Sequence, residues 1–170
     1  NNPSAVTVLT GCFPQAFPDA AEKIPEADVI TGSYNRASVL GAVRERLATG
    51  QRVIRITPHQ KGIHRKDSTF ERMKATSMNE RTRAFVKIQD GCDNRCTYCA
   101  IPLIRGPHVS VPMEQVLDEA RRLAAGGVRE LMVIAQDTTY YGVDLYGRRR
   151  LADLLTELCR IGGIEWIRLH

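Results

Sequence analysis

The sequence predicts an α/β protein with parallel sheets. Short segments rich in β-branched residues alternate with segments whose apolar residues recur at helical spacing. Two such series are present, and a charged segment with few periodic apolar positions separates them. Strands that are joined through helices by short connections imply right-handed crossovers, which place neighbouring strands parallel in one sheet.

The first series covers residues 1–57. Within it, Val39, Val43 and Leu47 recur with Leu40 at helical spacing, and Gly50 suits the end of that helix. The predicted elements are strands at 5–9, 27–31 and 52–56, a short helix at 14–24 and a longer helix at 35–50.

The second series covers residues 83–170. Pro112 suits the first turn of a helix that ends at Gly126 and Gly127, and a second helix carries a stripe of leucines. We interpret Cys159, beside that stripe, as a core residue. The predicted elements are strands at 84–88, 130–135 and 164–169, and helices at 112–125 and 150–161.

The two series predict two domains, 1–57 and 83–170, joined by a linker at 58–82. The chain begins with Asn1 rather than methionine and ends at His170, directly after a predicted strand. An intact domain rarely ends on a buried strand, so we expect an internal fragment of a longer protein.

The composition is that of a globular protein, with 43% hydrophobic and 25% charged residues. No apolar run approaches the roughly 20 residues that span a bilayer, and no secretory leader is apparent. These observations predict a cytoplasmic protein without a membrane segment. The net charge of +5 can attract RNA, although a solvated basic surface is the simpler interpretation.

The segment "GCDNRCTYCA" at 91–100 holds three of the five cysteines, Cys92, Cys96 and Cys99. Four interpretations compete for this spacing. A structural zinc site needs a fourth ligand, which would have to be His108. A disulfide would leave an odd thiol and is unusual in the cytoplasm. The thiols could also be unrelated, or they could hold an iron–sulfur cluster.

The iron–sulfur interpretation is favoured. Four cysteines would saturate a 4Fe–4S cluster, so three leave one iron open to bind a small chelating molecule. The loop also leaves the carboxyl end of the predicted strand 84–88. In parallel α/β barrels that edge is where active sites are built.

The spacing Cys92-x3-Cys96-x2-Cys99, with Tyr98 before the last cysteine, resembles the radical S-adenosylmethionine (SAM) signature. This resemblance implies that the open iron binds SAM, whose reduction yields a 5′-deoxyadenosyl radical. An electron donor such as flavodoxin or ferredoxin is then implied. So are SAM contacts from Tyr98, near the adenine, and from Gln136 and Asp137, near the amino group.

The segment "RAFVKIQDGCDNRCTYCAIPLIRGPHVS" resembles the methylthiotransferases, which convert C–H to C–SCH3. Segments after it are similar to the branch that modifies an aspartate of a small-subunit ribosomal protein. Segments before it are more similar to the branch that modifies N6-threonylcarbamoyladenosine beside the tRNA anticodon. The resemblance implies the end of an amino-terminal methylthiotransferase domain followed by the first βα units of a partial TIM-type barrel.

Cys12, in "LTGCFPQ", would by itself be interpreted as a small apolar filler. The family resemblance instead implies that it is one of three ligands of an auxiliary 4Fe–4S cluster, the second cluster of the full-length protein. The other two ligands would lie upstream. Outside this family, the chain could be a zinc-stabilised binding module that uses the three loop cysteines and His108.

Overall fold

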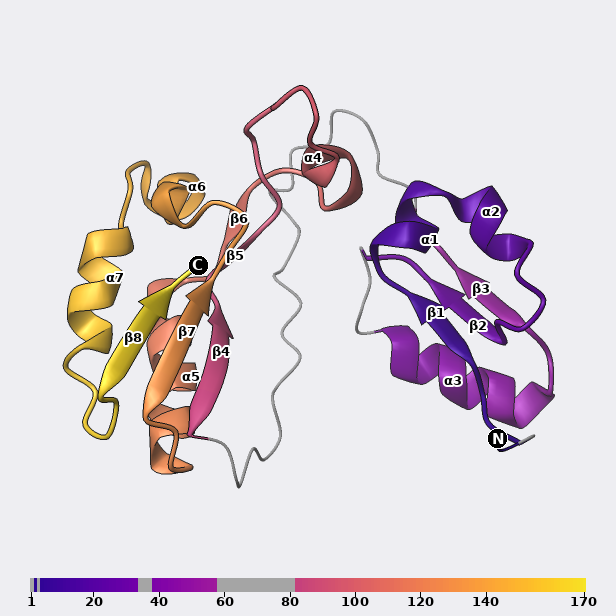
Figure 1. Ribbon diagram of the computed structural model, residues 1–170, viewed down its shortest axis with the longest axis horizontal. Coiled ribbons are helices and arrows are strands. Elements are labelled where there is room, and N and C mark those ends of the chain that lie inside the picture. Colours follow the sequence, from indigo (N-terminus) through magenta and orange to yellow (C-terminus); the bar gives the residue numbers. More distant parts are fainter. Residues whose placement is uncertain (1, 3, 34–37, 58–81) are drawn as a thin grey trace. The chain divides into compact units, whose positions relative to one another are not determined.

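The computed structural model describes residues 2, 4–33, 38–57 and 82–170, and these fall into two compact units (Figure 1). The first unit holds the described residues up to 57 together with 95–106. The second holds 82–94 and 107–170. The predicted linker at 58–82 lies outside the described residues except for Thr82, so its bounds stay a prediction.

The first unit contains a parallel three-stranded sheet in the order β1-β2-β3. Val8 lies opposite Val29, which in turn lies opposite Val53. This confirms the three strands predicted in the first series, each three residues long and so shorter than predicted, with β1 ending one residue later than expected. Their bounds are β1 (Val8–Thr10), β2 (Val29–Thr31) and β3 (Val53–Arg55).

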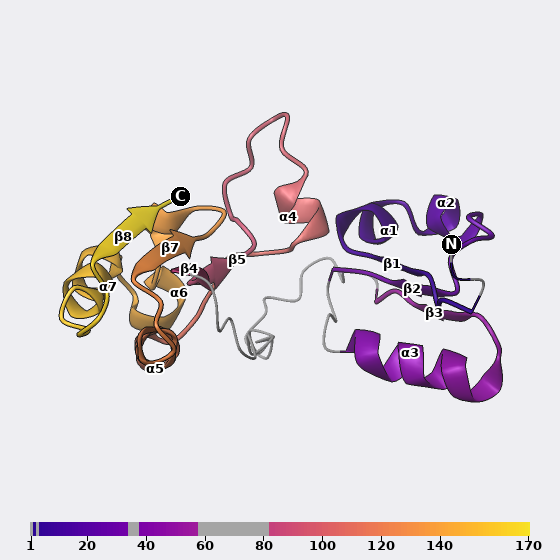
Figure 2. The same cartoon turned by 60° about the horizontal axis from the view of Figure 1, so that its bottom comes forward.

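Helices cover both faces of this sheet (Figures 1 and 2). Successive residues of a strand point to opposite faces. Val29 of β2 therefore packs with Ala42 of α3 (Ser38–Thr49), whereas Ile30 packs with Ala21 of α2 (Pro18–Glu22). The helix predicted at 35–50 is thus confirmed over the described residues.

The helix predicted at 14–24 is instead two helices, α1 (Cys12–Ala16) and α2. The break falls at Phe17, which has φ −132°, directly before Pro18. Proline has no N–H to donate into the preceding turn and disfavours helical geometry in the residue before it. A single periodic segment therefore forms two short helices.

The second unit contains a parallel sheet in the order β4-β7-β8. Two helices form the crossovers and lie on the same face of the sheet, as right-handed connections require (Figure 2). All five elements predicted in the second series are confirmed. Their bounds are β4 (Arg83–Lys87), α5 (Met113–Ala125), β7 (Glu130–Ile134), α7 (Leu151–Leu158) and β8 (Trp166–Leu169).

The largest hydrophobic core lies between this sheet and its two helices. Val86 and Leu131 from the sheet and Leu154 and Leu158 from α7 are fully buried there. The interpretation of Cys159 as a core residue is wrong, because its side chain is exposed at the end of α7. One residue advances a helix by about a quarter turn, which carries position 159 away from the buried face of Leu158.

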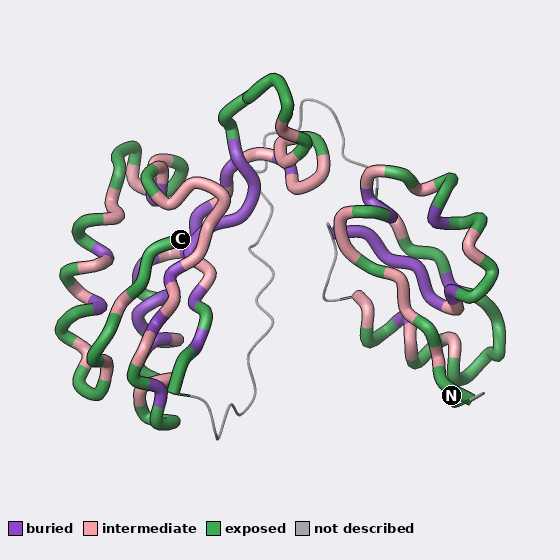
Figure 3. Tube along the Cα trace, in the orientation of Figure 1, coloured by how far each residue is buried: buried purple, intermediate pink, exposed green. Residues whose placement is uncertain are grey.

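Several short elements were not predicted. The strands β5 (Gln89–Asp90) and β6 (Val109–Ser110) pair antiparallel and bring together the two ends of the cysteine loop. These ends are buried or half-buried, whereas residues 93–98 between them are exposed (Figure 3). The other short elements are α4 (Ile101–Ile104), the 3-10 helix η1 (Thr138–Tyr140) and α6 (Val143–Tyr146).

No helix formed by the described residues is long and apolar enough to cross a membrane.

Candidate functional site

The cysteine loop and the segment after β7 leave the same edge of the second sheet. Lys87 of β4 lies opposite Ile134 of β7, and the Ile88 N–H donates to the Ile134 carbonyl oxygen at 3.1 Å. Both strands are parallel, so the residues that follow them emerge side by side. This places the predicted SAM contacts Gln136 and Asp137 beside the start of the cysteine loop.

The three loop cysteines are free thiols in different environments. Cys92 is buried, Cys99 is half-buried and Cys96 is exposed. The Cys99 N–H donates to the Cys96 carbonyl oxygen at 3.0 Å, which closes a tight turn. Cys92 belongs to the second unit, and the other two belong to the first. Among the described residues, no three Cys, His, Asp or Glu side chains are gathered closely enough to hold a metal ion.

His108 is not available as a fourth ligand. Its side chain is 1% exposed, and both ring nitrogens lie within hydrogen-bonding distance of protein atoms. Gln89 Nε2 lies 2.8 Å from Nδ1, and Ser110 Oγ lies 3.0 Å from Nε2. Zinc binding would require breaking one of these contacts. The donor chemistry that remains, three thiols in one loop, suits an iron–sulfur cluster better than a four-ligand zinc site.

Gln89 is the centre of a buried polar network at the base of the loop. It is fully buried, and its Oε1 accepts from the N–H groups of Gln136 and Asp137 at 3.2 and 3.3 Å. Its Nε2 donates to the Gly91 carbonyl oxygen at 2.5 Å. Through His108 the network continues to Ser110. One side chain therefore connects the residue before Cys92 with the end of β7.

The network ends at Asp144 of α6. Its Oδ2 accepts from the Ser110 N–H at 2.8 Å, and its Oδ1 lies 3.4 Å from His108 Nε2. Burial raises the pKa of this carboxyl, but hydrogen bonds from His108 and Ser110 outweigh that effect and lower it to about 2. Asp144 is therefore a carboxylate near neutral pH.

The two predicted SAM contacts after β7 differ in their surroundings. Asp137 caps η1, and its carboxylate accepts from the Thr139 hydroxyl at 2.7 Å and from Asn94 Nδ2 at 2.9 Å. The Thr139 and Asn94 hydrogen bonds lower its pKa despite partial burial. Gln136 Oε1 is buried and has no hydrogen-bond partner in the described part of the chain. Such an acceptor is costly unless a donor reaches it.

Tyr98 and Cys12 lie at less constrained positions. The Tyr98 side chain is 92% exposed. Cys12 is the half-buried first residue of α1 and follows Gly11, whose φ of 104° favours glycine.

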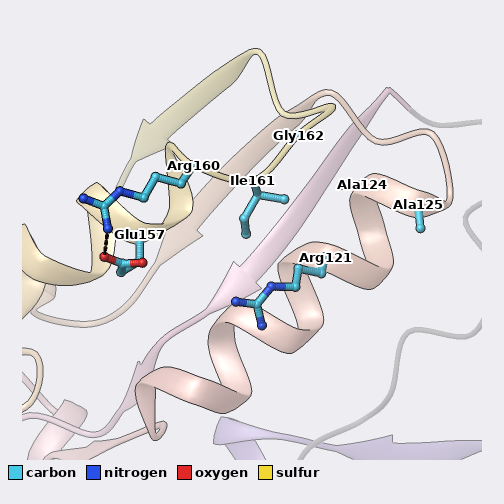
Figure 4. Close-up of a pocket in the computed structure, with 7 residues that line it drawn as sticks. All are labelled: Arg121, Ala124, Ala125, Glu157, Arg160, Ile161 and Gly162. Atoms are coloured by element: carbon cyan, nitrogen blue, oxygen red, sulfur yellow. Dashed lines mark hydrogen bonds and ion pairs between the residues drawn. The ribbon is translucent and has the colours of Figure 1, made fainter.

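Two pockets are lined by other residues of the described chain. One, of about 400 Å³, lies in the second unit between α5 and the end of α7, where Arg160 is paired with Glu157 (Figure 4). The other, of about 700 Å³, lies in the first unit and is lined mostly by apolar residues of α1, α2, β3 and α4. None of the cysteines lines either pocket.

Sequence reasoning missed Gln89, Ser110 and Asp144. The available signal was weak. Gln89 is a polar residue that continues an apolar strand, and Ser110 lies between two valines. Neither pattern distinguishes a buried network from an ordinary loop.

A family model described as the radical SAM superfamily matches residues 86–170, half of the chain. Three similar relatives are each named ribosomal protein uS12 methylthiotransferase RimO. The relative from Symbiobacterium thermophilum is 46% identical over 164 residues, which are 96% of this chain and 32% of the relative. The relative from Christiangramia forsetii is 41% identical over 95% of this chain and 32% of the relative. The relative from Lachnoclostridium phytofermentans is also 41% identical, over 96% of this chain and 36% of the relative.

The chain therefore spans about a third of the length of these relatives. The matches include both halves of the chain. They give no support to a different substrate for the first half.

Proposed function

Because the chain belongs to the radical SAM superfamily, we propose that the protein is a methylthiotransferase that converts a C–H bond to C–SCH3. The proposed substrate is an aspartate of a small-subunit ribosomal protein, and uS12 is the protein that the names of its relatives specify. The observation that carries the proposal is the three-cysteine loop at the carboxyl end of β4, in a chain similar over nearly its whole length to these enzymes.

Cys92, Cys96 and Cys99 would hold a 4Fe–4S cluster with one iron open to SAM. All three are free thiols, and a loop with no fourth cysteine matches that ligand set. When bound, the cluster and SAM supply the reducing electron and the radical that removes hydrogen from the substrate. The electron would come from a donor such as flavodoxin or ferredoxin.

The chain's own residues would bind and orient SAM at the end of β7. The Asp137 carboxylate, with its lowered pKa, offers a negative charge to the SAM amino group. The unpartnered Gln136 Oε1 offers a further acceptor beside it. Tyr98, which is exposed, is free to cover the adenine.

Cys12 would be one ligand of an auxiliary 4Fe–4S cluster that supplies sulfur. Its place at the start of α1 leaves its thiol half-buried and free to bind iron. This proposal includes two clusters in the complete protein, an amino-terminal domain over 1–57, and a partial radical SAM barrel over 83–170. A ribosomal substrate places the reaction in the cytoplasm.

Anaerobic reconstitution with iron and sulfide tests the proposal. We expect a brown protein whose visible absorption is bleached by dithionite and which cleaves SAM reductively. With the complete protein, which includes the upstream ligands of the auxiliary cluster, mass spectrometry of uS12 should then detect the added methylthio group. Modification of tRNA instead of uS12 would assign the protein to the branch that modifies tRNA. A colourless protein that binds one zinc ion would contradict the proposed enzyme and support the zinc-stabilised binding module.

A further inference from the structure

We propose that Gln89, His108 and Ser110 are positioning residues that hold the end of β7 against the base of the cysteine loop. Through this network they would fix Gln136 and Asp137 in the orientation that binds SAM. The inference rests on the proposed function, because it assigns a purpose to residues that do not themselves touch the cofactors.

The first step of the argument is the orientation of Gln89. Its oxygen faces two N–H donors, those of Gln136 and Asp137. Its nitrogen therefore faces Gly91 and His108 Nδ1, at 2.5 and 2.8 Å. Because both ends of the amide are used, the side chain has one satisfactory orientation in a site with no exposure to solvent.

The second step is the tautomer of His108. Since Gln89 directs its NH2 group at Nδ1, that nitrogen accepts, and the ring proton lies on Nε2. Nε2 then faces Ser110 Oγ at 3.0 Å and Asp144 Oδ1 at 3.4 Å. The edge of the Tyr140 ring packs against the imidazole, with the ring centroids 5.2 Å apart. The hydrogen bonds thus run in one direction, with Gln89 of β5 donating to His108 and His108 donating towards Ser110 and Asp144 of α6.

The third step is how the network fixes the segment after β7. Ser110 Oγ accepts from the Gly142 N–H at 2.9 Å. Gln89 fixes the start of this segment at 136 and 137, and Ser110 fixes its end at Gly142. The His108 N–H also donates to Asp93 Oδ1 at 3.1 Å, next to Cys92. Both segments that would contact the cofactors are therefore held by the same three residues, with His108 binding Asp93 through its backbone N–H.

Apolar residues of similar size could fill the same space, but they would leave the N–H groups of Gln136, Asp137 and Gly142 without their acceptors. What the polar network adds is a fixed orientation for backbone groups beside the site. Loss of such supporting contacts around metal sites typically weakens binding or activity by about 10-fold to 100-fold.

The test compares Gln89→Leu with the parent protein after anaerobic reconstitution. The measurement is SAM affinity, taken from the change that SAM causes in the electron paramagnetic resonance spectrum of the reduced cluster. We expect about 10-fold weaker SAM binding in Gln89→Leu, with unchanged iron content. The matched control is Val86→Ala, another fully buried position near the same end of β4. It should lower thermal stability and leave SAM affinity within about twofold of the parent.

Equal loss of SAM affinity in both variants, or unchanged affinity in Gln89→Leu, would overturn the positioning role. If Gln89→Leu takes up no iron, Ser110→Ala decides. It removes the contacts of the Ser110 hydroxyl with Gly142, His108 and Asp144. A loaded protein with parental SAM affinity would contradict the inference. A parent protein that shows no spectral response to SAM would instead overturn the proposed function.

Discussion

The base and the tip of the cysteine loop are built in opposite ways. At the base, Gln89–Cys92 and the residues from His108 to Val111 are buried or half-buried and closely hydrogen-bonded. At the tip, all residues from Asp93 to Tyr98 are exposed (Figure 3). The base is therefore a buried polar network, whereas the tip is exposed and is anchored at its start by Asp93 and Asn94.

This difference indicates which part of the proposed site needs the cofactor. The polar groups at the base already have partners, so its geometry does not depend on a bound metal. Of the three proposed ligands, Cys96 lies in the exposed tip, whereas Cys92 is buried in the base. Metal binding supplies free energy that orders such ligands. We therefore expect the cluster to organise the tip and to leave the base unchanged.

The largest expected effect is at the tip. Cys96→Ala should abolish cluster assembly and all SAM cleavage, because it removes one of the three proposed ligands. The unfolding free energy of the apoprotein should change by less than about 0.5 kcal/mol, since Cys96 is exposed. Iron and sulfide content, visible absorption and 5′-deoxyadenosine release measure the loss. Cys159→Ser, at the other exposed cysteine, should keep the parental iron content. Parental cleavage by Cys96→Ala would reject the ligand assignment.

Substitutions at the base of the loop should instead lower the unfolding free energy of the apoprotein. The Tyr141 hydroxyl is buried and donates to the Val111 carbonyl oxygen at 2.8 Å. Tyr141→Phe leaves that acceptor unsatisfied and should cost about 1–3 kcal/mol in urea unfolding of the apoprotein. Tyr140→Phe, at the neighbouring and partly exposed position, is the control and should change stability by less than about 0.5 kcal/mol. Equal effects of the two variants would remove the distinction between base and tip.

Low pH should reduce the stability of the folded protein through Asp144, at the base of the cysteine loop, over a defined range of pH. The pKa of Asp144 is about 2 in the folded protein, against 3.8 for a free aspartate. Its stabilising contribution is therefore complete above about pH 4 and is lost as the pH falls towards 2. After allowance for its partial exposure, we expect roughly 1–2 kcal/mol.

The measurement is the difference in unfolding free energy between the parent and Asp144→Asn from pH 7 to pH 2. This difference should shrink at the acid end. Asp118→Asn on the exposed side of α5 is the control, and its effect should stay below about 0.5 kcal/mol. A difference for Asp144→Asn that persists unchanged at pH 2 would show that the carboxylate charge is not the cause.

The smallest effect on stability is expected at Tyr98. Tyr98→Ala should leave the melting temperature of the apoprotein unchanged, because the side chain is 92% exposed. If Tyr98 covers the adenine, SAM binding by the reconstituted protein should weaken several-fold. A lower melting temperature for Tyr98→Ala would show that this side chain packs against the protein in solution, which would contradict an exposed tip.

The regular elements and the cysteine loop could be predicted from sequence because their signals are local. β-branched segments and helical periodicity gave all six parallel strands, and a spacing gave the three thiols. The base could not be predicted in this way. β5 and β6 have two residues each, too few for an alternating pattern. The Gln89–Asp144 network joins residues 55 positions apart, and only the folded chain brings them together.

The wrong interpretation of Cys159 and the disfavoured zinc alternative through His108 have the same origin. Cys159 follows the leucine stripe in sequence, but the helix ends at Leu158 and turns the next side chain outward. His108 has the right chemistry for a zinc ligand, but its two nitrogens are engaged with Gln89 and Ser110. In both cases the residue type was compatible with the role, and the burial and orientation that decide the role come from tertiary structure.

The hydrogen bond from Asn94 to Asp137 joins the cysteine loop directly to the segment after β7. Asn94 lies two residues after Cys92 and donates to Oδ2 of the carboxylate that we propose binds the SAM amino group. An ammonium group that takes this oxygen competes with the asparagine amide. Such an exchange would release Asn94 near the start of the loop, so that binding of the proposed cationic ligand would change the contacts of the segment that carries the thiols.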